Sequence, residues 1–241
     1  MNKGIRAYVA EFIGTFLFLF TGMSAVVGHT LLNFGTSAGV IIPLAFGLGL
    51  VVAIFALGHI SGAHFNPAVT LAFAITRKNF GWGDVPGYLV AQLLAGVAVA
   101  AIQAYAFGAY EGFATATTLP GMVGGAQVAV GIVALFEFLA TFGLMFVITA
   151  VATDTRIQGV PAGLAIGFTV AALALGTGWV SGGSFNPARS FGPALIAGDF
   201  SFQWVYWVAP ILGAVAAVFA YDFVRGPVVA PAPVMRDTTL T

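Results

Sequence analysis

An eight-residue stretch occurs twice in this chain and constrains its fold more than any other feature. Residues 61–68 read SGAHFNPA and residues 181–188 read SGGSFNPA, so six of the eight positions are identical. Each copy lies between long apolar segments and is itself followed by a short one. The repeat therefore places two short elements among segments that are long enough to cross a membrane.

The Asn-Pro-Ala triplet inside each copy predicts the start of a helix. Asparagine is a favoured N-cap residue because its side-chain oxygen accepts a hydrogen bond from the first turn, and proline suits the first helical position. The side-chain NH2 group then remains as a donor beside the positive end of the helix dipole. We expect half helices over residues 66–76 and 186–197, with the motif residues Asn66, Pro67, Ala68, Asn186, Pro187 and Ala188.

The composition is that of an integral membrane protein. Hydrophobic residues make up 60% of the 241 residues and charged residues 7%, against about 25% charged residues in soluble domains. The net charge of zero argues against nucleic acid as a partner. Because the chain has no cysteine and only three scattered histidines, we expect no disulfide, no metal centre and no cofactor.

Six segments carry about the 20 apolar residues that a membrane span needs. The first is longer than the hydrophobic region of a signal peptide, so we interpret it as a span. We expect residues 110–125 to be an extracellular connecting loop, Asp84 to cap the third helix, and residues 226–241 to be a disordered cytoplasmic tail. The predicted spans are residues 7–28, 38–58, 86–109, 126–153, 160–178 and 202–224.

The basic residues indicate the orientation of these spans. Seven of the eight fall at one face if each half helix returns to the side from which it entered. Because cytoplasmic loops carry an excess of Lys and Arg, we place this face and both termini in the cytoplasm, in a multi-pass protein of the cell membrane. The seven are Lys3, Arg6, Arg77, Lys78, Arg156, Arg225 and Arg236, and the exception is Arg189.

The duplication extends beyond the repeated octapeptide. Glu11 is matched by Glu137 within similar hexapeptides, and Gly47 and Gly167 each lie 19 residues before the Asn of their own half. Each half has three spans, an odd number, so the halves form an inverted repeat, a pattern that places a binding or permeation site at mid-membrane. The sequence therefore predicts an all-α membrane protein whose half helices meet at their N-termini. The predicted halves are residues 1–109 and 126–225.

Two Asn-Pro-Ala motifs at matching places in a duplicated six-span chain resemble the aquaporin family, the major intrinsic proteins, over about residues 5–225. The resemblance implies six tilted helices and two half helices, with one pore in each subunit of a homotetramer in the lipid bilayer. It also implies passive passage of water. Ions are excluded because a narrow pore strips their hydration and because the two positive helix ends repel cations.

The family places an outer constriction around Arg189, a charged side chain at membrane depth and hence a functional one. The resemblance implies that Phe46, Ala174 and Gly183 complete this selectivity filter. Water-selective members resemble one another in having His at the position of Ala174, and this chain has no His after His64. The small side chain predicts a wider opening, which small neutral solutes such as glycerol, urea and ammonia would also pass.

Other positions resemble those of water channels rather than glycerol channels. Ser190 follows the motif Arg where glycerol channels carry Asp, and Tyr206 and Trp207 stand where they carry a Pro-aliphatic pair. Gly183 supplies none of the aromatic bulk that they add at the constriction. We therefore predict a passive water channel, with a channel for small neutral solutes as the alternative.

Three further residues are expected to support the loops. Glu11 and Glu137 are intramembrane carboxylates at mirror positions, which the family uses as hydrogen-bond acceptors for unwound backbone. A proton relay or a cation site is the alternative interpretation of these two residues. His64 stands beside the first motif and is expected to face or brace the cytoplasmic half of the pore.

Two other classes of protein share part of this pattern. A secondary transporter also has inverted repeats and broken helices, and it would cluster coupling carboxylates at mid-membrane. A structural membrane junction protein would assemble without conducting any solute. We do not expect an enzyme, because no nucleophile has a base at a workable spacing.

Overall fold

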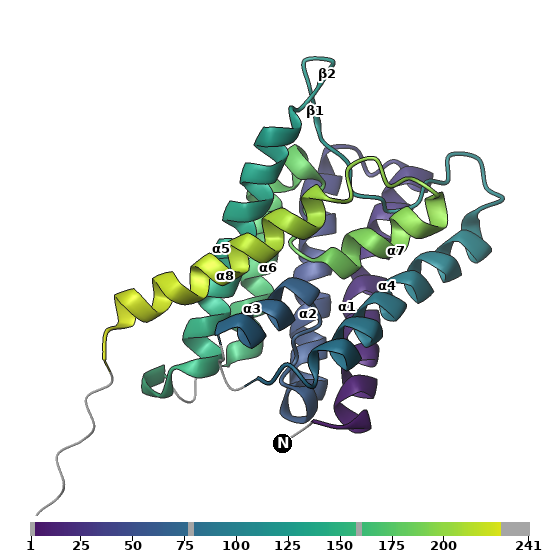
Figure 1. Cartoon of the computed structure of the whole chain (residues 1–241). Helices are drawn as coiled ribbons and strands as arrows, with labels where there is room; N and C mark the ends of the chain where they lie inside the picture. Colours follow the sequence, from purple (N-terminus) through teal and green to yellow (C-terminus); the bar gives the residue numbers. More distant parts are fainter. Residues whose placement is uncertain (1–2, 77–79, 158–160, 228–241) are drawn as a thin grey trace, which may run out of the picture.

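The computed structural model describes residues 3–76, 80–157 and 161–227. In this part of the chain, six helices are long and apolar enough to cross a membrane, and two shorter α-helices lie between them (Figure 1), together with the single-turn 3-10 helices Gly35–Ser37 and Thr155–Ile157. The prediction of six spans and two half helices is therefore confirmed. The long helices are α1 (Ile5–Leu32), α2 (Ala38–Ser61), α4 (Val85–Phe107), α5 (Val130–Thr153), α6 (Ala162–Ser181) and α8 (Val205–Arg225), and the half helices are α3 (Pro67–Thr76) and α7 (Pro187–Ala197).

Some predicted features lie outside the described residues. The tail expected over residues 226–241 is described only as far as Pro227. The basic pair expected at the end of the first half helix, Arg77 and Lys78, follows the last described residue of α3.

The segment that joins the two halves contains a small hairpin that the sequence did not predict. Strand β1 (Met122–Val123) pairs with the antiparallel strand β2 (Ala126–Gln127). Its two turn residues, Gly124 and Gly125, have φ values of 59° and 83°, as a tight two-residue turn requires. Helix α5 therefore begins at Val130, four residues later than expected.

Asp84 precedes α4 but does not cap it, so this prediction was wrong. Its side chain makes no hydrogen bond to the first turn of α4. Instead, Oδ1 accepts hydrogen bonds from the backbone N–H of Lys3 and from the hydroxyl of Tyr8, both at 2.8 Å. The carboxylate thus links the start of α1 to the start of α4. Its hydrogen-bond donors come from α1 and the residue before it instead of from the first turn of α4.

Helices α2 and α6 cross at equivalent points of the inverted repeat. A Cβ atom on Gly47 would lie 2.6 Å from the carbonyl oxygen of Gly167, and a Cβ atom on Gly167 would lie 2.6 Å from that of Gly47. Only glycine fits at such a reciprocal contact between backbones. The two halves are therefore related by an approximate two-fold axis that passes near this crossing.

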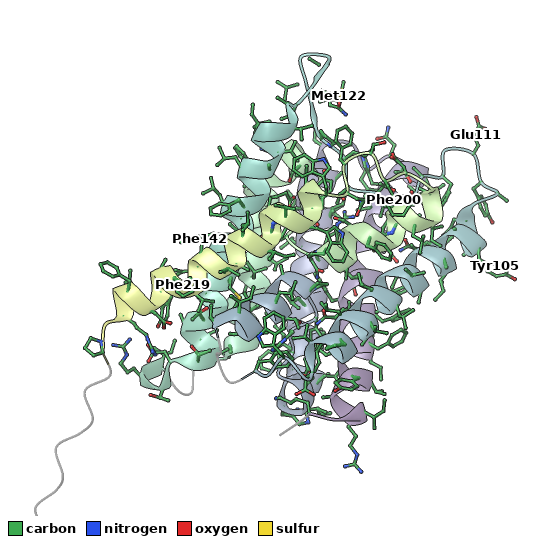
Figure 2. All side chains as sticks on the ribbon, in the orientation of Figure 1. Tyr105, Glu111, Met122, Phe142, Phe200 and Phe219 are labelled. Atoms are coloured by element: carbon green, nitrogen blue, oxygen red, sulfur yellow. The ribbon has the colours of Figure 1, made fainter. Side chains whose placement is uncertain are left out.

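Apolar side chains cover the outside of the long helices. Val52 on α2 and Phe219 on α8 are each 59% exposed. Figure 2 shows Phe219 pointing away from the other helices. Apolar surface of this extent is unfavourable in water and matches the hydrocarbon of a bilayer.

Candidate functional site

Each half helix begins at the Asn of its Asn-Pro-Ala triplet. Oδ1 of Asn66 accepts a hydrogen bond from the N–H of Ala68 at 2.8 Å, and Oδ1 of Asn186 accepts one from the N–H of Ala188 at 2.9 Å. The proline between the Asn and the Ala of each triplet occupies the first helical position, where an N–H would have no partner within the helix. Both Asn side chains are buried. We refer to Asn66 and Asn186 as the Asn pair.

The Asn pair also ties the two loops to each other. Nδ2 of Asn66 donates to the carbonyl oxygen of Phe185, and Nδ2 of Asn186 donates to that of Phe65, both at 2.8 Å. Phe65 and Phe185 present these carbonyls with φ values of 48° and 53°, a conformation that bulky residues seldom adopt. Residue types and spacing do not predict this exchange, which engages one of the two hydrogens of each amide.

Two buried carboxylates accept hydrogen bonds from the loops that precede the half helices. Glu11 accepts from the backbone N–H groups of His64 and Phe65, at 3.0 and 2.7 Å. Glu137 accepts from the equivalent groups of the second loop, those of Ser184 and the residue after it, at 2.9 and 2.8 Å. Backbone N–H groups that no regular element satisfies therefore have side-chain carboxyl oxygens as acceptors.

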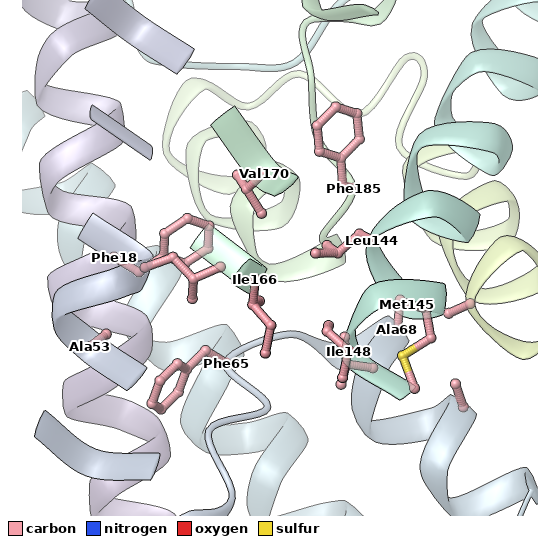
Figure 3. Packing of buried hydrophobic residues seen from close by; sticks show 14 of the residues in the cluster. Phe18, Ala53, Phe65, Ala68, Leu144, Met145, Ile148, Ile166, Val170 and Phe185 are labelled. Atoms are coloured by element: carbon pink, nitrogen blue, oxygen red, sulfur yellow. The ribbon is translucent and has the colours of Figure 1, made fainter. Parts of the chain in front are cut away.

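A cavity of about 510 Å³ opens between the helices and reaches the Asn pair. Its walls are mainly apolar, and Figure 3 shows Phe18, Leu144 and Val170 contributed by three different helices. His59 and Phe55, near the end of α2, also line it. A molecule that enters this cavity therefore passes apolar side chains before it meets the two amide donors.

Arg189 is buried, with 3% of its surface exposed, and does not line this cavity. One guanidinium nitrogen, Nη1, donates to the carbonyl oxygen of Ala116, and Nη2 donates to that of Gly182 at 3.5 Å. Ala116 belongs to the segment that joins the two halves, and sequence reasoning missed this contact. The guanidinium is thus oriented by backbone carbonyls of two separate loops.

The structure brings two of the four expected filter residues into direct contact. Cζ of Arg189 lies 5.2 Å from the centroid of the Phe46 ring, within the range of a cation–π interaction. Gly183 comes directly after Gly182, whose carbonyl oxygen accepts from Arg189, and it has a φ of 61°. Ala174 is partly buried on α6 and packs against the main hydrophobic core. None of these four residues lines the cavity that reaches the Asn pair.

The family model of the major intrinsic proteins matches residues 1–221 of this chain. The chain belongs to this family. It is 43% identical over 225 residues to Aquaporin NIP1-1 of Oryza sativa subsp. japonica, covering 92% of this chain and 75% of the relative. It is also 43% identical over 227 residues to Nodulin-26 of Glycine max, covering 92% and 78%.

A solved structure shows the same fold. The X-ray structure of the aquaglyceroporin from Plasmodium falciparum superposes with a TM-score of 0.80, at 24% identity, covering 91% of this chain and 96% of that one. The expected aquaporin-like architecture is therefore confirmed. Members of the major intrinsic protein family are passive membrane channels and not enzymes, so the chain is a channel protein of this class.

Beside the Asn pair, the two halves of this major intrinsic protein carry different side chains. In the first half, the imidazole of His64 is buried and lines the cavity, with Nδ1 3.1 Å from the hydroxyl of Thr70. Aromatic rings surround it, with the centroid of the Phe80 ring 4.6 Å away and that of Tyr88 5.0 Å away. His64 is thus fixed by packing on several sides.

In the second half, the corresponding position is Ser184, which belongs to a chain of hydroxyls. Its Oγ lies 2.5 Å from Oγ of Ser190, and the hydroxyl of Thr118 donates to Ser190 at 2.7 Å. Ser184 Oγ also donates to the carbonyl oxygen of Asn186 at 3.0 Å. Two residues of the segment that joins the halves therefore contact the start of α7. Thr118 donates to Ser190, and the carbonyl oxygen of Ala116 accepts from Arg189.

Proposed function

We propose that this protein is a passive channel for water. The exchanged hydrogen bonds of the Asn pair, at the deep end of an apolar cavity, carry this proposal. Each amide keeps one hydrogen that a passing water can accept, so the oxygen of that water is occupied and its own hydrogens point away. A water held in this way interrupts a chain of proton transfer.

Ions meet two further barriers at the same place. Moving an ion from water into a narrow apolar passage removes hydration that the walls do not replace. The N-termini of α3 and α7 both point at the Asn pair, and each carries a positive charge of about half a unit from the helix dipole. Neutral water has only hydrogen bonds to exchange, so it passes where a cation does not.

We propose Arg189, Phe46, Ala174 and Gly183 as the outer filter. The contact between the guanidinium and the Phe46 ring supports this grouping. Two backbone carbonyls hold the guanidinium in one orientation, so its remaining donors face in a fixed direction and its charge repels cations. Glu11, Glu137 and His64 are proposed to support the loops that carry the Asn pair.

Small neutral solutes such as glycerol, urea or ammonia are the second candidate cargo. The observation that favours them is the small size of Ala174 and Gly183, which leaves only Phe46 and Arg189 as bulky members of the proposed filter. A wider filter admits molecules larger than water as long as they are uncharged. The electrostatic barrier at the Asn pair is unaffected by this width.

We propose that the end of the bundle that carries Lys3, Arg156 and Arg225 faces the cytoplasm of the cell. Lys3 precedes α1, Arg156 follows α5 and Arg225 is the last residue of α8. The start of α1 and the ends of α5 and α8 lie toward the lower side of the molecule in Figure 1. The positive-inside rule places such an end in the cytoplasm, together with both termini. We further propose the homotetramer that is typical of this family, with one pore in each subunit.

Stopped-flow light scattering from proteoliposomes tests the proposed function. Reconstituted protein should accelerate the osmotic response well beyond that of empty liposomes, and parallel uptake of glycerol, urea and ammonia measures the second candidate. Saturable flux that requires an ion gradient would indicate a secondary transporter instead. Normal assembly without any flux would indicate a structural protein, and either result would refute the proposal.

A further inference from the structure

The contacts between the two halves define a correspondence between their residues. The Asn pair exchanges equivalent hydrogen bonds at the same length of 2.8 Å. Gly47 and Gly167, each 19 residues before the Asn of its own half, meet in a reciprocal backbone contact. A residue at a given distance from Asn66 in the sequence thus has a counterpart at the same distance from Asn186.

This correspondence relates each of the four residues of the proposed outer filter to one other residue of the chain. Ile166 is the counterpart of Phe46, because each lies 20 residues before the Asn of its own half. Val69 is the counterpart of Arg189, because each lies three residues after that Asn. The same spacing relates Ile54 to Ala174 and Ala63 to Gly183. We call Ile54, Ala63, Val69 and Ile166 the inner ring.

All four residues of the inner ring line the cavity that reaches the Asn pair. Val69 and Ile166 are only 2% and 8% exposed, so packing holds them in place. A Cβ atom on Gly58 would lie 3.6 Å from both Cβ of Ala63 and Cγ2 of Ile54, so both side chains lie near Gly58 of α2. Figure 3 shows Ile166 on the same side of this space as Val170. The four residues of the inner ring therefore share the wall of one cavity as well as a relation in sequence.

The chemistry of the inner ring is opposite to that of the outer filter. A guanidinium and an aromatic ring stand on the outer side, whereas the four inner side chains carry no polar atom. Apolar side chains do not replace the hydrogen bonds that a solute gives up when it leaves water. An apolar constriction in a channel therefore opposes passage by losing its water, and it does so most strongly for well-hydrated solutes.

We propose that the inner ring is a second selectivity constriction of this channel, which discriminates among neutral solutes by size and by hydration. This inference rests on the proposed function, because it assumes that the chain conducts. The outer filter and the inner ring then act in series: charge is excluded on one side of the Asn pair, and bulk and strong hydration are excluded on the other.

The first test widens the inner ring. The variant Ile54→Ala/Ile166→Ala removes two large side chains from the cavity wall, and Ile60→Ala/Leu164→Ala is the matched control on the same two helices. Ile60 and Leu164 are 42% and 38% exposed and do not line the cavity. Glycerol and water permeability are measured on the same proteoliposomes and normalised to the reconstituted protein.

We expect the ratio of glycerol to water permeability to rise about tenfold in the widened variant, the lower end of what a missing methylene changes in a close-fitting site. The control should keep the wild-type ratio. A ratio within about twofold of wild type in the widened variant would overturn the proposal, since the same assay shows that the channel conducts. Wild-type liposomes without any flux would instead refute the proposed function itself.

The second test changes polarity at nearly constant shape. Val69→Thr places a hydroxyl in the inner ring without widening it, so it is informative even if the double variant fails to fold. We expect the water permeability to rise, because the hydroxyl offers a hydrogen bond in the dry section, while glycerol passage stays limited by size. An unchanged or lower water permeability would contradict the proposal that the apolar inner ring opposes the passage of hydrated solutes.

Discussion

Glu137 offers a sharp test of how the outer loop is held. Its Oε1 accepts hydrogen bonds from the hydroxyl of Ser181 at 2.6 Å and from the N–H of Ser184 at 2.9 Å, and its Oε2 accepts from the N–H of Phe185 at 2.8 Å. In Glu137→Gln, an NH2 group replaces one of the two oxygens. At least one buried N–H then faces another donor and loses its acceptor.

The magnitude follows from the number of donors that lose their partner. A buried N–H without an acceptor costs about 1–3 kcal/mol, so Glu137→Gln should lower the free energy of unfolding by about that amount. Glu137→Ala leaves two backbone N–H groups unsatisfied and should lower it by about twice as much. Because this loop also carries the Gly182 carbonyl that orients Arg189, the glycerol-to-water ratio should rise in both variants.

Glu11→Gln is the matched control, because Glu11 holds the other loop. It should lower stability by a similar amount while leaving the environment of Arg189 unchanged. Chemical unfolding in detergent measures the stability, and stopped-flow scattering measures the permeability ratio. If Glu137→Gln leaves both quantities at their wild-type values, the carboxylate does not hold the loop. If it abolishes a proton-coupled flux instead, the proton-relay interpretation is correct.

Three further predictions concern inhibition, selectivity and pH. Mercurials should leave the water permeability unchanged because the chain has no cysteine, and thiol-reversible inhibition would contradict this. Ala174→His should lower the glycerol-to-water ratio by about tenfold by filling the outer filter with a polar ring, and an unchanged solute leak would show that the filter lies elsewhere. Hydrogen bonds from Arg156 hold the pKa of Asp154 below its usual range. This contribution is complete above the ordinary pKa of an Asp side chain and is lost as pH falls through the lowered pKa. The difference in thermal stability between wild type and Asp154→Asn should therefore be constant between about pH 6 and 8, with the variant less stable. A wild-type transition in that pH range that is absent from the variant would count against the assignment.

The elements of the fold follow from local rules, and the sequence therefore predicts them well. Hydropathy identifies the spans because bilayer thickness sets their length. The starts of α3 and α7 follow from the Asn-Pro pairs, because capping and the fixed φ of proline act within a few residues. Two bounds differ by four residues: α1 continues to Leu32, and α5 starts late because the apolar run begins inside the hairpin, where Gly124 and Gly125 form the turn.

The partners of the candidate site depend on distant parts of the chain, and the sequence does not reveal them. Asp84 has the residue type and position of a cap, yet Lys3 and Tyr8 supply its donors. Arg189 stands out as an intramembrane charge, but its contact with Ala116 crosses 73 residues of sequence. Such pairings arise from tertiary packing, which residue type and spacing alone do not specify.

The exchanged bonds of the Asn pair have a consequence for biosynthesis. The acceptor of Asn66 lies 119 residues later in the chain, in a loop that the ribosome makes long after α3. Until the second loop enters the membrane, the amide of Asn66 has no permanent protein acceptor at this site, and the first loop lacks its donor from Asn186. The first half therefore reaches its final form only when the second half has been inserted, and a chain truncated before Phe185 would expose an incomplete membrane segment to quality control.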